Sequence, residues 1–196
     1  PTIENGGATN DIVTVGAGDT IWSITGEAVE LEPGVQVLNA DGEIVSYEEG
    51  EIDLRQLVVT FEFPEGITWE DGTPVTAADY ELAYTQDCNP ESGGVSYSVC
   101  ESIEGIDFVS DTSYVITYLP GAQWPEYFAW PIGTYSNLFS LGAYPAHHEL
   151  SDGRLLADVP AEEWSTLPEI AEDPLSYGPY MLVEWEKGQR MVFEAN

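Results

Sequence analysis

The chain has 196 residues, and its 43% hydrophobic and 12% aromatic content is enough to form a folded core, which excludes a disordered chain. Acidic residues number 36 and basic residues only 4, for a formal net charge of -32. Nucleic acid and anionic membrane surfaces are therefore excluded as partners, because both are bound through clustered Lys and Arg. No apolar run approaches the ~20 residues that a membrane-spanning helix needs.

The first part of the chain predicts short strands joined by turns, because short alternating runs stand at 11–15 and 42–45. Between them, residues 39–43 read Asn-Ala-Asp-Gly-Glu, which predicts a hairpin turn. The spacing of acidic residues there does not match a calcium-binding EF-hand loop. We therefore predict neither a metal site nor a cofactor.

A strand followed by a turn and a helix is predicted in the middle of the chain. Residues 56–63 carry alternating β-branched and aromatic side chains, which favour a strand. Asp-Gly and Thr-Pro pairs within 67–74 mark a turn. Thr76 then suits a helix N-cap, with Asp79 as the third helical residue in a variant of the capping box, so a helix is predicted over 77–87.

The two cysteines, Cys88 and Cys100, flank a turn-rich loop. Two thiols with eleven residues between them match neither a zinc site nor a C-x-x-C redox motif. We expect a disulfide that closes this loop, contributes roughly 2–3 kcal/mol and indicates an oxidising compartment. Two independent buried thiols are the alternative.

The second half of the chain predicts two further hairpins and short helices. The hairpins pair 105–109 with 114–118 and 178–185 with 189–193. Short helices are predicted near 123–130 and from Ala161. The resulting fold class is α+β, with an antiparallel or mixed sheet and a few short helices.

Four segments resemble the extracellular solute-binding proteins of peptide and nickel ABC transporters, a family that includes oligopeptide- and dipeptide-binding proteins. Residues 60–79 match its pattern T-F-x-L-R-x-G-x-x-W-x-D-G-x-P-V-T-A-x-D, except that Phe63 and Pro64 replace the usual Leu and Arg. Residues 145–147 resemble its Pro-Lys-His, and 177–190 its G-x-G-P-Y segment. A hairpin pattern of the family is also matched by residues 103–119.

The resemblance implies part of the first lobe of a two-lobed, periplasmic-binding-protein-like (class II) fold. Residues 1–40 match poorly, 41–175 correspond to the accessory subdomain of that lobe, and 176–196 to a hairpin that returns to its main sheet. We expect the chain to be a piece of a longer polypeptide whose second lobe carries most ligand-anchoring groups.

The resemblance also suggests ligand contacts at Tyr97 and Tyr135. In the oligopeptide-binding branch the segment after the helix can bring a tyrosine to the peptide cleft, which is where Tyr97 stands. Tyr135 belongs to an aromatic cluster that is more typical of a core. For the pair His147-His148 and the turn at 69–72 we expect structural roles, and we predict no catalytic residue.

The function that follows from the resemblance is capture of peptides or related small solutes for the membrane permease of an ABC importer. The expected location is extracytoplasmic, with a lipid anchor as one way of holding the whole protein at the membrane. Two alternatives from other classes stay open: an acidic secreted hydrolase that uses a carboxylate pair, and a surface interaction module.

Overall fold

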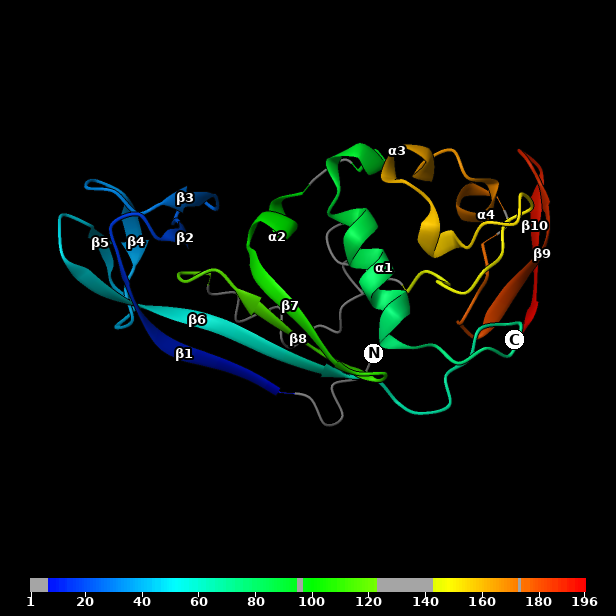
Figure 1. Cartoon of the computed structure of the whole chain (residues 1–196), viewed down its shortest axis with the longest axis horizontal. Helices are drawn as coiled ribbons and strands as arrows, with labels where there is room; N and C mark the ends of the chain where they lie inside the picture. Colours follow the sequence, from blue (N-terminus) through cyan, green and yellow to red (C-terminus); the bar gives the residue numbers. More distant parts are fainter. Residues whose placement is uncertain (1–6, 95–96, 123–142, 173) are drawn as a thin grey trace. The chain divides into compact units, whose positions relative to one another are not determined.

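The computed structural model describes residues 7–94, 97–122, 143–172 and 174–196 (Figure 1). The chain divides into two compact units. Unit 1 comprises Pro1–Phe63 and Ser96–Ser140, and unit 2 comprises Pro64–Val95 and Leu141–Asn196. The chain therefore passes from unit 1 to unit 2 and back again before it ends in unit 2.

Unit 1 contains a four-stranded antiparallel sheet. Its strands, in spatial order, are β1 (Gly7–Gly16), β6 (Glu51–Glu62), β8 (Ser113–Tyr118) and β7 (Ile103–Ser110). On β6 the side chains of Leu57, Val59 and Phe61 alternate toward the interior, which is the period-two pattern of a strand with one buried face. The strand predicted at 56–63 is confirmed, although it begins earlier, at Glu51. The hairpin predicted at 105–118 is confirmed as β7 and β8.

Residues 17–50, which we call the insert, lie between the paired ends of β1 and β6, where Gly16 is opposite Glu51. The insert forms two small antiparallel hairpins that gather at the far end of β1 and β6 (Figure 1). Their strands are β2 (Thr20–Trp22), β3 (Ala28–Glu30), β4 (Gln36–Leu38) and β5 (Ile44–Ser46). The insert has a small core. Its buried side chains are Ile21, Leu31, Val37 and Tyr47, and they pack with Val15 of β1 and Leu54 of β6.

The predicted turn at 39–43 is confirmed, because it joins β4 to β5. The side-chain oxygen of Asn39 accepts hydrogen bonds from the backbone N–H groups of Asp41 (3.1 Å) and Glu43 (2.8 Å). Gly42 has φ of 84°, a left-handed conformation that favours glycine. The carboxylates of this segment thus flank a turn.

Unit 2 is built around the helix α1 (Ala77–Asp87), which has the bounds predicted from the sequence. Its other elements are η1 (Pro90–Ser92), η2 (Leu156–Asp158), α3 (Ala161–Trp164), α4 (Pro168–Ala171), β9 (Tyr180–Glu186) and β10 (Arg190–Ala195). Leu82 of α1 packs into a core with Leu150, Leu156, Val159, Trp164 and Leu167. The C-terminal hairpin β9–β10 and the short helix from Ala161 are confirmed.

Two expectations from the sequence are not tested by the structure, and one short helix was not predicted. The short helix expected at 123–130 lies outside the described residues. The helix α4 was not predicted, because four residues with a proline at the start give no readable periodicity. The domain boundaries at 40/41 and 175/176 stay predictions.

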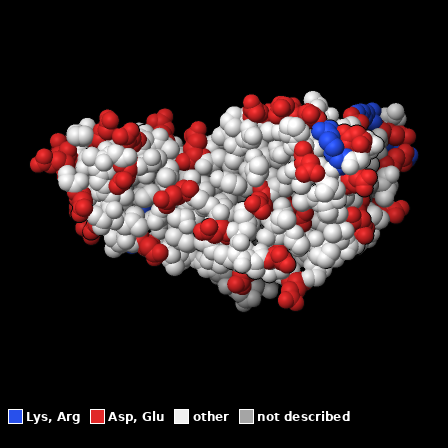
Figure 2. Space-filling model, in the orientation of Figure 1, with Lys and Arg blue, Asp and Glu red and all other residues white. Residues whose placement is uncertain are grey.

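The surface carries the charge imbalance of the sequence. Figure 2 shows acidic side chains spread over the visible face of each unit, while most of the basic side chains gather in unit 2. There Arg154 pairs with Asp152 and Glu163, and Arg190 pairs with Glu184. In the described part of the chain, no helix has the length and apolar character needed to cross a membrane.

Candidate functional site

Asp79, in the first turn of α1, is a buried carboxylate with only 2% of its surface exposed. Its Oδ2 accepts hydrogen bonds from the backbone N–H of Thr76 (2.8 Å) and the indole N–H of Trp69 (3.2 Å), and its Oδ1 accepts one from the N–H of Ala146 (2.9 Å). The predicted contact of Asp79 with the helix start is confirmed. The same carboxylate also connects the turn before the helix to the loop at Ala146.

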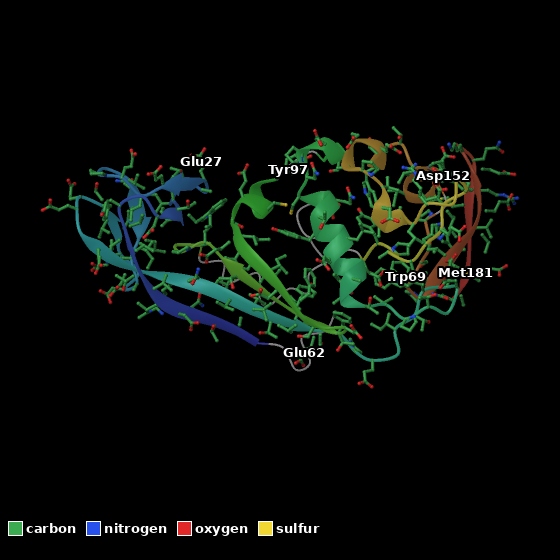
Figure 3. All side chains as sticks on the ribbon, in the orientation of Figure 1. Glu27, Glu62, Trp69, Tyr97, Asp152 and Met181 are labelled. Carbon is green, nitrogen blue, oxygen red and sulfur yellow. The ribbon has the colours of Figure 1, made fainter. Side chains whose placement is uncertain are left out.

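Trp69 is the point where three of the four segments that carry the family resemblance meet. Its side chain is 1% exposed and lies inside unit 2 (Figure 3). Its ring centroid is 6.2 Å from that of His147 and 5.0 Å from that of Tyr177. The backbone of the neighbouring Glu70 donates to the carbonyl of Ser176 at 2.8 Å. These contacts support the structural role expected for the turn at 69–72.

His147 is held by an acidic residue of the same turn. Its Nε2 lies 2.8 Å from Oδ2 of Asp71. A hydrogen bond from the backbone N–H of Thr73, followed by the one from His147, lowers the pKa of Asp71 to about 2. Within the described residues, no group of His, Cys, Asp or Glu side chains could hold a metal ion.

Asp87, the last residue of α1, is a partly buried carboxyl group. Burial raises its pKa to about 6, although the hydroxyl of Tyr144 donates a hydrogen bond to it at 3.1 Å. A raised pKa is one property of a general acid in a carboxylate pair. The contact that its carboxylate makes is with a tyrosine hydroxyl.

Cys88 and Cys100 are joined by the disulfide that we predicted. The loop between them is rich in turns: Asn89 caps η1 by accepting from the N–H of Glu91 (2.9 Å), and Gly93 ends η1 with φ of 84°. Tyr97 is half-buried, and its carbonyl accepts from the N–H of Glu101 at the end of α2 (Ser98–Glu101; Figure 3). A ligand contact by Tyr97 remains a prediction. Tyr135, the other predicted contact, lies outside the described residues.

Unit 1 contains a pocket with a volume of about 670 Å³. One wall comes from β1 and the insert: Val13, Thr14, Val15, Asp19, Thr20 and Ala28. The other wall comes from β6, α2 and the ends of β7 and β8: Gln56, Glu101, Ile103, Glu104, Leu119 and Pro120. The volume lies in the range of small-molecule sites, which is about 300–1,000 Å³.

This pocket could not be predicted from the sequence. Its lining residues are distributed from Val13 to Pro120, and each segment taken alone is an ordinary strand or turn. Only the pairing of β1 with β6, and of β6 with β8, brings these segments together. No motif in the chain could have signalled it.

Comparison with known families identifies the chain. Residues 47–196 match the model described as "Bacterial extracellular solute-binding proteins, family 5 Middle". This match covers well over half of the 196 residues, so the chain belongs to the family 5 extracellular solute-binding proteins. The family is one of extracellular binding proteins. A search of curated protein sequences returned no significant match.

Solved structures show the same fold. NikZ from Campylobacter jejuni, solved in complex with Ni(L-His), has 20% sequence identity and a TM-score of 0.52 over 92% of this chain. The oligopeptide-binding protein AppA from Bacillus subtilis, solved with a nonapeptide, has 15% identity and a TM-score of 0.55, again over 92% of this chain. The chain spans only 29% and 35% of the lengths of those two proteins. The prediction of an α+β fold that forms part of a two-lobed binding protein is thus confirmed.

Proposed function

We propose that this chain is part of an extracytoplasmic protein that captures peptides or related small solutes and delivers them to the membrane permease of an ABC importer. On this proposal the protein binds and releases its ligand unchanged, and it is not an enzyme. The observation that carries the proposal is the family match over residues 47–196.

The structural neighbours support the proposal through what was bound to them. NikZ was solved with a nickel–histidine complex, and AppA was solved with a nonapeptide. Both ligands are small solutes with amino-acid character. Peptides are the solute class that we propose for this chain.

The proposal extends to the organisation of the chain. We assign residues 1–40 to a segment of its own, 41–175 to an accessory subdomain of the first lobe, and 176–196 to a hairpin of the main sheet of that lobe. Tyr97 and Tyr135 are the proposed ligand contacts. A lipid anchor on the whole protein would keep it close to the permease.

Isothermal titration calorimetry with a library of di- to oligopeptides tests the proposal. The protein titrated is the whole natural protein to which this chain belongs. We expect saturable binding with a dissociation constant of about 1 μM or lower, equivalent to about -8 kcal/mol. Mass spectrometry of the library after incubation should find every peptide intact. Absence of saturable binding would overturn peptide capture, and cleaved peptides would indicate a hydrolase.

The role of Tyr97 is tested separately with the variant Tyr97→Ala. Truncating an aromatic contact residue is expected to weaken peptide binding about tenfold. Tyr180→Ala is the control, because Tyr180 is 63% exposed on β9 and has no proposed ligand role. Equal affinity of both variants would remove Tyr97 from the site while leaving peptide capture intact.

A further inference from the structure

The pocket in unit 1 has a wall that does not come from the part of the chain that matches the family. Asp19, Thr20 and Ala28 belong to the insert, whereas the family match begins at residue 47. The opposite wall, which includes Glu101 and Glu104, lies within the match. The insert therefore supplies, together with β1, one wall of the pocket.

The two walls are held together by backbone contacts. The N–H of Trp22, in the insert, donates to the carbonyl of Pro120 at 2.8 Å, while within the other wall the N–H of Gly121 donates to the carbonyl of Arg55 at 2.8 Å. A Cβ on Gly121 would lie 2.5 Å from the carbonyl oxygen of Trp22, so the two backbones approach as closely as a glycine allows. These contacts hold the insert against the segment after β8.

The charged side chains of the pocket all have the same sign. Asp19 lines it from the insert, Glu101 and Glu104 line it from the other wall, and all three residues are exposed. None of the described residues that line it is Lys, Arg or His. The pocket therefore repels anions and attracts cations.

Two of these carboxylates are fixed by hydrogen bonds. Oδ2 of Asp19 accepts from the N–H of Gly16 at 2.8 Å. Glu104 accepts from the side-chain amide of Gln56, which also donates to the carbonyl of Tyr118 at 3.0 Å. Their charges are thus held at the pocket wall before any ligand arrives, which reduces the entropic cost of binding.

The shape and lining of the pocket distinguish an organic cation from a metal ion. Among the described residues, no three acidic side chains converge closely enough to hold a metal. The lining also includes four apolar side chains, Val13, Val15, Ile103 and Leu119, beside its polar groups. A ligand that fits has a charged group for the carboxylates and a compact apolar body for these side chains.

From these observations we propose that the pocket between the insert and the sheet of unit 1 binds a small organic cation, a protonated amine or guanidinium on an apolar body. This goes beyond the proposed capture of peptides. The pocket lies within one unit, and its use does not depend on an importer.

Calorimetric titration with benzylamine, which is a cation near neutral pH, tests the proposal in about 0.15 M salt, where long-range attraction is screened. We expect saturable binding of one benzylamine per chain. Benzyl alcohol and benzoate, which have a similar size but no positive charge, should not bind. Absence of saturable binding of benzylamine would overturn the proposal, as would equal binding of benzyl alcohol.

Charge-neutralising variants distinguish this pocket from the general acidity of the chain. Asp19→Asn and Glu104→Gln should each weaken benzylamine binding about tenfold, because each removes a fixed charge from the wall. Glu65→Gln is the matched control: it removes one charge at an exposed position outside the pocket and should change the affinity less than about twofold. Equal effects of all three variants would show diffuse attraction of cations and would overturn the site.

A variant that fills the pocket without changing its charge completes the test. Ala28→Trp places an indole at the insert wall, where Ala28 is exposed, and should abolish benzylamine binding. Thermal unfolding measured alongside verifies that the variant is folded. Unchanged binding by folded Ala28→Trp would overturn the assignment.

Discussion

Asp79 shows how one residue of the family pattern acts through its hydrogen bonds. Its carboxylate is buried and accepts from Thr76, Trp69 and Ala146, so it fixes the helix start, the preceding turn and a distant loop at once. A glutamate would place the carboxylate one methylene further out, and an apolar residue would leave three donors without acceptors. The aspartate at this position of the pattern thus has a structural explanation.

The first prediction concerns this residue. Asp79→Ala should lower the free energy of unfolding by about 3–5 kcal/mol, because the buried donors that it leaves are costly. Urea unfolding followed by tryptophan fluorescence measures the change. Glu81→Ala, at an exposed position of the same helix, is the control and should change stability by less than about 0.5 kcal/mol. A similar loss in both variants would contradict the structural role of Asp79.

Asp87 gives a pH-dependent prediction. Its pKa is about 6 in the folded chain, above the ordinary value of 3.8, so folding favours the protonated form. Its contribution to stability is complete below about pH 4 and is lost as the pH rises through about 6. Above that pH the ionised carboxylate lowers the stability of the fold.

Asp87→Asn should therefore stabilise the chain by about 1–2 kcal/mol near pH 8, a figure reduced for partial solvent exposure. The asparagine oxygen can still accept from the hydroxyl of Tyr144. Thermal unfolding of the unchanged chain and of Asp87→Asn at about pH 4, 6 and 8 should give melting temperatures that converge toward acid pH. A constant difference across this range would exclude titration of Asp87 as the cause.

At the scale of elements, the insert is held against the segment after β8 by a close approach of two backbones. Gly121 has φ of 91°, and its hydrogen atom faces the carbonyl of Trp22 where a Cβ would be 2.5 Å from the oxygen. The N–H of Trp22 is bonded to Pro120, next to this glycine. The β2 strand and the segment after β8 can lie this close only because residue 121 has no side chain.

Gly121→Ala is expected to lower the free energy of unfolding by about 2–4 kcal/mol, since a left-handed alanine is strained and the Cβ forces the backbones apart. Chemical denaturation measures the loss. Gly105→Ala on β7 is the matched control, because nothing lies within 4 Å of its Cβ position and its φ is not in the left-handed region. If both variants were equally stable, the close approach would not matter for the fold.

The elements that the sequence predicted correctly are those with local signals. The helix at 77–87 begins at a recognisable capping pattern, and the strand at 56–63 has alternating β-branched and aromatic side chains. The start of that strand was missed because residues 51–55 contain three charged residues, and they extend only because β1 pairs with them. The pocket could not be predicted, since it depends on contacts between β1, the insert and the segment near Pro120.

At the scale of the whole molecule, a net charge of -32 opposes folding through repulsion among 36 acidic residues. The ion pairs of the described residues are exposed, as in Arg154 with Asp152 and Lys187 with Glu172. Exposed pairs contribute about 0–1 kcal/mol each. Repulsion is therefore the larger effect, and screening it with salt should raise the stability of the folded chain.

The melting temperature should rise as sodium chloride increases from about 0.02 to about 0.5 M, because the screening length falls from roughly 20 Å to a few Å. Differential scanning calorimetry at constant pH measures the shift. A neutral osmolyte added at matched osmolarity serves as the control for exclusion effects. A melting temperature that falls with salt would mean that attractive pairs outweigh repulsion in this chain.

The pairing of Gly16 with Glu51 has a consequence for how such chains diversify. Because the insert begins and ends at this pair, a change of length within its loops leaves the register of β1 and β6 unchanged. A connector grafted in its place would have to cover Val15 and Leu54 and also supply a donor for the carbonyl of Pro120. Changes confined to the loops of the insert would therefore alter one wall of the pocket while the strand pairing stays the same.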